Sequence, residues 1–130
     1  LDSKGEVEAN EIRTLETQGI PEVPSPLCDG RYVYFVKNGD VLTCLELKTG
    51  RRVYRMRTQG RGTHYASPLI AGGHLFTIAG DGRISVLTLG PKQKLLAANE
   101  MRGRGYATPA ISDGVLYVRT HSKLFAFGKK

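Results

Sequence analysis

The sequence repeats itself with a period of about 42 residues, and this repeat constrains the fold more than any other feature. The segment HYASPLIAGGHLF (64–76) returns as GYATPAISDGVLY (105–117), and a fainter copy, PEVPSPLCDGRYVYF (21–35), precedes both. The first two copies align without a gap over thirty positions, so that Ser25 falls on Ser67. The third copy follows after 41 residues and lacks one residue in a turn. Repeats of about 40 to 45 residues are typical of the blades of β-propellers.

Each repeat has the composition of short antiparallel strands joined by tight turns. In the first repeat, YVYFV (32–36) and VLTCLEL (41–47) are rich in β-branched and aromatic residues. They flank the dipeptide NG (38–39), which suits a hairpin turn with positive φ. A short strand at 26–28 comes before them, and RRVYRMRT (51–58) follows as a fourth strand. We therefore predict four strands, A to D, in each complete blade.

The repeat divides the chain into four parts and predicts an all-β fold of about three propeller blades. Residues 25–66 and 67–107 each form a blade of four antiparallel strands, and 108–130 form a partial blade with strands A to C. Residues 1–24 hold the end of a preceding blade, with a D strand at 11–17, and a linker. Propellers close with about four to eight blades. We therefore expect a larger ring, completed by further blades of a parent chain or by a homo-oligomer in which copies exchange the strand at 11–17.

The charge of the chain is unevenly distributed. Residues 1–24 carry −4, whereas the remainder carries +11, which gives +7 for the whole chain. Such a basic body attracts anions, so an anion-binding surface for nucleic acid or an acidic glycan is one functional alternative. Nucleic acid is the less expected partner, because an excess of Lys and Arg is also found on ordinary solvent-exposed surfaces that bind nothing. The longest apolar runs have four to six residues and predict no membrane span, and no signal peptide is visible.

The segment GDVLTCLELKTGRRVY (39–54) resembles the repeat of the pyrroloquinoline-quinone-like (PQQ-like) propellers, whose blades typically read G-x-L-Y-A-L-D-x-x-T-G-x-x-x-W. The corresponding residues here are Leu42, Leu45, Glu46, Thr49, Gly50 and Tyr54. The segments VPSPL, YASPL and YATPAISDGVLYVRTHSKLFAFG are similar to the C-terminal end of secreted bacterial propellers of this superfamily. The resemblance implies a periplasmic or secreted bacterial protein.

The resemblance implies two kinds of function. Some members are non-catalytic scaffolds that bind polypeptides, such as the outer-membrane protein assembly lipoproteins. Others are quinoprotein dehydrogenases, which hold PQQ and a calcium ion on an eight-bladed ring. This chain has no Trp, and Tyr54 and Leu96 stand where the enzymes have a blade-locking Trp. We therefore expect a non-enzymatic scaffold without a cofactor that binds protein or carbohydrate, and a fragment of a PQQ-dependent dehydrogenase is the alternative.

The residues that could carry chemistry form no catalytic or metal-binding motif. Cys28 and Cys44 lie on strands A and C of one blade, with strand B between them, so their Cα atoms are expected about 10 Å apart. We expect two free, buried cysteines. The three histidines lack metal-ligand spacing, and no serine lies in a nucleophile elbow. Ser67 and Thr108, which precede Pro in successive repeats, are expected to bind backbone groups.

The topology of antiparallel blades places the D-to-A loops and the B-to-C turns on the same face of the disc. Loops on a rigid scaffold often carry function, and Arg and Tyr are frequent at binding hot spots. The predicted binding residues are Arg61, His64, Tyr65, Arg102, Arg104 and Tyr106. Turn residues join them on the same face, namely Lys37, Arg83, His121 and Lys123, opposed by Asp40, Asp81 and Glu100. Tyr65 and Tyr106 recur in register, so packing between blades is the alternative role for both.

Overall fold

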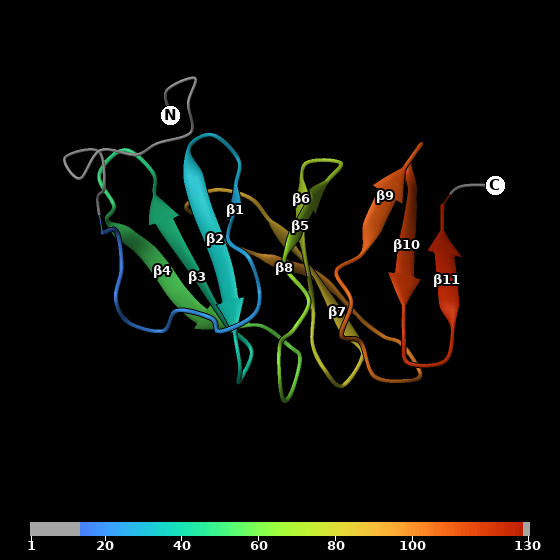
Figure 1. Cartoon of the computed structure of the whole chain (residues 1–130). Coiled ribbons are helices and arrows are strands. Elements are labelled where there is room, and N and C mark those ends of the chain that lie inside the picture. Colours follow the sequence, from blue (N-terminus) through green and yellow to red (C-terminus); the bar gives the residue numbers. More distant parts are fainter. Residues whose placement is uncertain (1–13, 129–130) are drawn as a thin grey trace, which may run out of the picture.

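A computed structural model describes residues 14–128, and all regular structure in this range is β-strand (Figure 1). The first sheet contains β1 (Leu27–Cys28), β2 (Tyr32–Lys37), β3 (Val41–Glu46) and β4 (Arg52–Arg57). The second contains β5 (Leu69–Ala71), β6 (His74–Ile78), β7 (Arg83–Thr88) and β8 (Leu95–Glu100). The third contains β9 (Ala110–Ser112), β10 (Val115–Arg119) and β11 (Leu124–Phe127). The predicted all-β fold is confirmed.

Each sheet is an antiparallel meander, so strands that follow one another in the chain are also neighbours in the sheet. The strands fall within one or two residues of the predicted A to D strands of the three repeats. Of the D strand predicted at 11–17, residues 11–13 lie outside the described range, and 14–17 form no strand. Backbone ladders require a neighbouring strand, and the described residues offer none beside this segment.

The hairpin turns take the positive φ values that the glycines predict. In the turn between β2 and β3, Gly39 has φ +81° and Asp40 has φ +62°. A register shift follows in each complete sheet at equivalent positions, between Cys44 and Leu45 in the first and between Val86 and Leu87 in the second. Such a bulge increases the local twist of the sheet. The repeat in sequence is therefore also a repeat in backbone shape.

The three sheets lie face to face in the order of the chain (Figure 1). Two clusters of buried residues, one on each side of the central sheet, cover both of its faces. The core between the first and second sheets contains Tyr32, Tyr34, Leu42, Cys44, Leu75 and Leu87. The core between the second and third sheets contains Ala66, Ile78, Ile84, Met101 and Val118. Because side chains alternate between the two faces of a strand, the central sheet supplies apolar residues to both cores. Radial packing of this kind is how propeller blades bury their sheets.

Hydroxyl side chains link successive sheets in a repeating hydrogen-bond pattern. The backbone N–H of Ser25 donates to Ser67 Oγ at 2.8 Å, and the N–H of Ser67 donates to Thr108 Oγ1 at 2.9 Å. The predicted role of Ser67 and Thr108 in binding backbone groups is therefore confirmed. We call this row of contacts the hydroxyl ladder.

The two cysteines differ from each other in burial. Both are free, and Cys44 is buried as predicted, but Cys28 is exposed. The prediction for Cys28 was wrong because β1 is only two residues long and alternation directs its two side chains to opposite faces. Leu27 packs against the core between the first two sheets, so Cys28 lies on the other face.

Candidate binding site on the loop edge

One edge of the stack collects all the D-to-A loops and B-to-C turns, as the topology predicted (Figure 1). This loop edge consists of the turns at 38–40, 79–82 and 120–123 and the loops at 58–68 and 101–109. Equivalent backbone hydrogen bonds connect each loop to the next blade. Gly80 N donates to Thr63 O at 2.8 Å, and His121 N donates to Arg104 O at 3.0 Å. Each loop is therefore fixed to two blades, which makes the loop edge a rigid platform.

Two tyrosines from successive loops form an exposed pair on this platform. The rings of Tyr65 and Tyr106 meet edge to face, with centroids 5.1 Å apart and planes at 86°. Their exposed fractions are 44% and 42%, so each ring packs on its neighbour and still presents a large area to solvent. Such aromatic pairs contribute about 0.5–1.5 kcal/mol beyond their burial. The two predicted binding tyrosines therefore lie together and are accessible.

The three predicted binding arginines are exposed, and their guanidinium groups have no hydrogen-bond or ion-pair partner among residues 14–128. They are Arg61, Arg102 and Arg104. Other arginines of the chain are held in place. Arg83 donates to Gln59 O at 3.1 Å and lies 3.4 Å from Glu100. The cationic groups of the loop edge are therefore free to contact a ligand, whereas Arg83 is engaged within the fold.

The remaining predicted binding residue, His64, does not contribute its side chain to the surface. It is 1% exposed, and its Nε2 lies 2.8 Å from Asp40 Oδ1. Asp40 is also buried, and its Oδ2 accepts the N–H of Gly60 at 2.6 Å. His64 and Asp40 thus join the end of one loop to the B-to-C turn of the same blade. This pair supports the platform from beneath.

The loop edge is hollowed beside Tyr106. One hollow of about 210 Å³ is lined by Arg104, Tyr106, Ala107, Arg119, Thr120 and His121. An adjoining hollow shares three of these residues and adds Asp81 and Gly103. Sequence analysis had placed His121 among the accompanying turn residues but had missed Arg119. Comparison of the repeats carries the signal, because Arg119 takes the place of the apolar Ile78.

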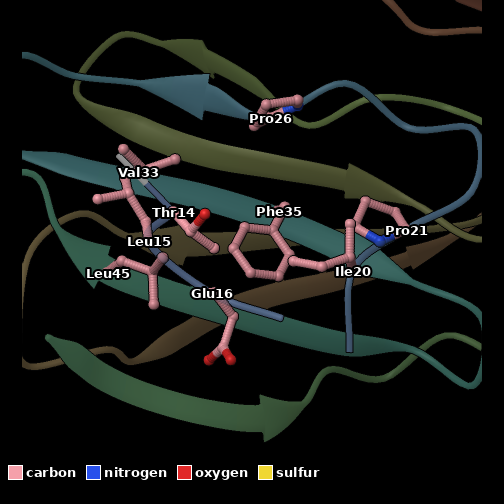
Figure 2. A pocket seen from close by; sticks show the side chains of 9 residues that line it. All are labelled: Thr14, Leu15, Glu16, Ile20, Pro21, Pro26, Val33, Phe35 and Leu45. Atoms are coloured by element: carbon pink, nitrogen blue, oxygen red, sulfur yellow. The ribbon is translucent and has the colours of Figure 1, made fainter. Parts of the chain in front are cut away.

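A separate, apolar hollow of about 250 Å³ lies at the opposite end of the stack (Figure 2). The segment 14–21 crosses the outer face of the first sheet there, and Figure 2 shows its apolar side chains beside those of β2 and β3. The lining residues are Thr14, Leu15, Glu16, Ile20, Pro21, Pro26, Val33, Phe35 and Leu45. The segment shields this face: Phe35 is 4% and Leu45 2% exposed.

Ionic contacts hold the segment 14–21 on the first sheet. Glu16 Oε2 lies 3.3 Å from Arg55 and 3.4 Å from Arg52. The pKa of Glu16 lies below its ordinary value, first because the backbone N–H groups of Gln18 and Thr17 bind its carboxylate. The two guanidinium groups lower the pKa further. The segment is therefore fixed by charge on one side and by apolar contact on the other.

A buried tyrosine makes a second polar connection between the first two blades. Tyr34 Oη donates to Asp29 Oδ2 at 2.9 Å and accepts the N–H of Gly90 at 2.8 Å. Burial raises the pKa of Tyr34 well above its ordinary value, so the hydroxyl remains protonated. Burial also raises the pKa of Asp29, but hydrogen bonds from Tyr32, Arg31 and Tyr34 outweigh that effect and leave it below its ordinary value.

The described residues contain no group of three or more His, Cys, Asp or Glu side chains placed to hold a metal ion. In the same range, no helix has the length and apolar character needed to cross a bilayer.

Comparison with known proteins identifies relatives of the chain. Residues 6–127 match the sequence model of a family described as outer membrane protein assembly factor BamB. Among solved structures, BamB from Moraxella catarrhalis matches 78% of this chain with a TM-score of 0.62 and 24% sequence identity. This chain spans 32% of that chain, and the likeness at this identity shows a shared propeller fold. No curated protein matches the chain significantly.

Proposed function

Because the chain belongs to the family of the outer membrane protein assembly factor BamB, we propose that it is part of a non-enzymatic propeller scaffold that binds a protein partner through its loop edge. The observation that carries the proposal is the exposed Tyr65–Tyr106 pair, whose two loops also carry arginines that have no partner among the described residues. Aromatic and Arg side chains on a rigid surface are the usual anchors of protein interfaces. A carbohydrate is the alternative ligand.

Membership of this family supports a proposal about the cellular location of the scaffold and about the class of protein that it binds. We propose that the protein acts in the periplasm, associated with the outer membrane, and that its partner takes part in the assembly of outer-membrane proteins. Loops fixed to two blades lose little conformational entropy on binding, which favours recognition by a preformed surface. No cofactor is needed for such a role.

The third sheet supports the proposal that the ring is completed by further blades, from a longer parent chain or from a second copy. Ile84 of the central sheet is 4% exposed because the third sheet covers it. Its equivalent in the third sheet, Leu124, is 71% exposed, and Tyr117 on the same face is 36% exposed. An apolar sheet face of this kind is stabilised when another blade packs against it. Light scattering distinguishes the two sources, since a mass of one chain excludes the homo-oligomer.

A photocrosslinking experiment tests the proposed binding function. A photoreactive amino acid replaces Tyr106, and a control protein carries it in place of Arg51, which is exposed in the turn between β3 and β4 on the opposite edge. We expect Tyr106 to give adducts with one protein of the outer-membrane assembly machinery in the native bacterium, and Arg51 to give none. Adducts that are identical from both positions, or absent from Tyr106, would contradict the proposal.

The absence of a cofactor is tested on the purified protein. We expect no quinone absorbance and no stoichiometric calcium in elemental analysis. A bound quinone together with calcium would instead favour the dehydrogenase alternative.

A further inference from the structure

The edge of the stack opposite the loop edge carries the turns that join strands A to B and strands C to D (Figure 1). We call it the turn edge, and it consists of the segments 29–31, 47–51, 72–73, 89–94 and 113–114. Blades pack against one another through the faces of their sheets, whereas these turns lie beyond the ends of the strands. A further blade at either end of the stack therefore leaves the turn edge accessible.

The C-to-D turns are basic in every repeat and contain no acidic residue. The first two read LKTGR (47–51) and LGPKQK (89–94), and the third C strand is followed by GKK (128–130), of which 129–130 lie outside the described residues. The second turn is one residue longer than the first, yet Arg51 and Lys94 occupy equivalent positions. The carbonyl oxygen of Arg51 accepts the N–H of Glu46 at 2.9 Å, and that of Lys94 accepts the N–H of Thr88 at 3.0 Å. The positive charge therefore recurs even though the length of the turn changes.

Three of the basic side chains on the turn edge are free to contact a ligand. Arg51, Lys92 and Lys94 are exposed, and their side chains make no hydrogen bond or ion pair within residues 14–128. Arg52, at the start of β4, is engaged instead, because it lies 3.4 Å from Glu16. A basic side chain that served the fold would need an internal partner of this kind. The three free cationic groups are therefore not explained by the fold.

The acidic residues of the turn edge do not neutralise these charges. Glu46, at the end of β3, accepts the hydroxyl of Thr49 at 2.6 Å, and Asp29 accepts the N–H of Arg31 at 2.9 Å. Neither of them, nor Asp113 in the A-to-B turn of the third sheet, forms an ion pair within the described part of the chain. The turn edge therefore carries a net positive charge that extends over the first two blades.

We infer that the turn edge binds the surface of a lipid bilayer that contains anionic phospholipids. A flat, negatively charged surface reaches the turns of neighbouring blades at the same time, because these turns lie at one edge (Figure 1). Each Lys or Arg near such a surface strengthens binding about fivefold. Single-stranded nucleic acid is a poorer fit, because its binding sites use aromatic side chains for stacking and the C-to-D turns contain none. The inference goes beyond the proposed function: it places a membrane at one edge, whereas the proposed protein partner binds the other.

Sedimentation with lipid vesicles tests the inference on the full chain. We expect the protein to bind vesicles that contain phosphatidylglycerol at least about tenfold more tightly than vesicles of phosphatidylcholine alone, with an affinity that falls as salt is added. Lys92→Gln combined with Lys94→Gln should weaken this binding at least about tenfold, and Arg51→Gln in the first blade about threefold or more. As the matched control, Arg102→Gln combined with Arg104→Gln removes two charges from the loop edge and should change vesicle binding less than about twofold.

The measurement has outcomes that overturn the inference. Equal affinities for the two kinds of vesicle would show that no anionic lipid is recognised, and equal losses in the two double variants would show that only the net charge of the chain matters. A short DNA duplex that displaces the vesicles and binds more tightly than they do would assign the turn edge to nucleic acid. Thermal unfolding verifies that the variants are folded. If the vesicles fail to bind while crosslinking from Tyr106 still succeeds, only this inference falls, and the proposed function stands.

Discussion

Substitution of His64 tests whether the buried pair with Asp40 supports the loop edge. The two side chains are 0% and 3% exposed, and His64→Ala leaves the carboxylate of Asp40 with the N–H of Gly60 as its remaining bond. Removing one member of a buried pair costs about 3–5 kcal/mol, because the other polar group stays buried without compensation. Since Asp40 keeps one donor, we expect about 3 kcal/mol. This is a large part of the ~5–15 kcal/mol that typically stabilises a domain.

The second repeat shows that the loop can form without either group. Gly82 and Gly105 occupy the positions of Asp40 and His64 there. Replacement of both residues by alanine should therefore cost clearly less than the sum of the two single replacements. We expect a coupling energy of about 2 kcal/mol, within the range measured for residues in contact.

Urea unfolding of the single and double variants measures these values. His74→Ala is the matched control, because His74 is partly exposed and its side chain makes no hydrogen bond or ion pair in the described structure. It should cost less than about 1 kcal/mol. Additive effects within about 0.5 kcal/mol, or a His64→Ala variant as stable as the control variant, would refute the reasoning. If the His64→Ala variant is as stable as the control but no longer binds the protein partner, His64 would belong to the binding site instead.

Three further predictions concern accessibility, backbone conformation and pH. Iodoacetamide should label Cys28 in the native protein but Cys44 only in urea, because Cys44 is buried and burial raises its pKa to about 11; mass spectrometry distinguishes the sites. Gly82→Ala should lower the free energy of unfolding in urea by about 3 kcal/mol or more for two reasons. Gly82 has φ +86°, which strains any residue with a side chain, and the added Cβ would clash with the carbonyl oxygen of Gly103. Gly30→Ala, with φ +93° and open space, should cost about 1–2 kcal/mol, and equal costs would contradict the steric explanation. The lowered pKa of Asp29 stabilises the fold above its ordinary pKa of 3.8, and this contribution is lost as the pH falls through the lower folded value. Asp29→Asn should therefore flatten the decline in stability below about pH 4, as measured by circular dichroism.

The strands and sheets could be predicted from the sequence because the repeat presents the same pattern three times. A single short apolar run is ambiguous, but aligned runs with glycine turns at matching positions specify a four-stranded unit. Burial of individual side chains was harder to predict. Cys28 aligns with apolar residues, yet it lies on the outward face of a two-residue strand. Alignment records which positions are equivalent, but not which of them another blade covers.

The candidate site was predicted in part for the same reason. Tyr65 and Tyr106 recur in register, and topology alone places both loops on one edge. His64 has glycine as its counterpart in the next repeat, so no repeated pattern reveals its contact with Asp40, which lies 24 residues earlier. Arg119 lies within a strand rather than a loop, and only the folded structure shows that it borders the hollow.

The hydroxyl ladder bears on how such proteins evolve. Each contact joins the backbone amide of one unit to the side-chain hydroxyl of the next. Ser67 takes part in two of them, because its hydroxyl accepts from Ser25 and its amide donates to Thr108. A gene duplication that inserts a whole unit therefore brings both halves of a new contact with it and leaves the existing interfaces chemically unchanged. Rings with different numbers of units can arise from one another in this way, without a redesign of the joints between them.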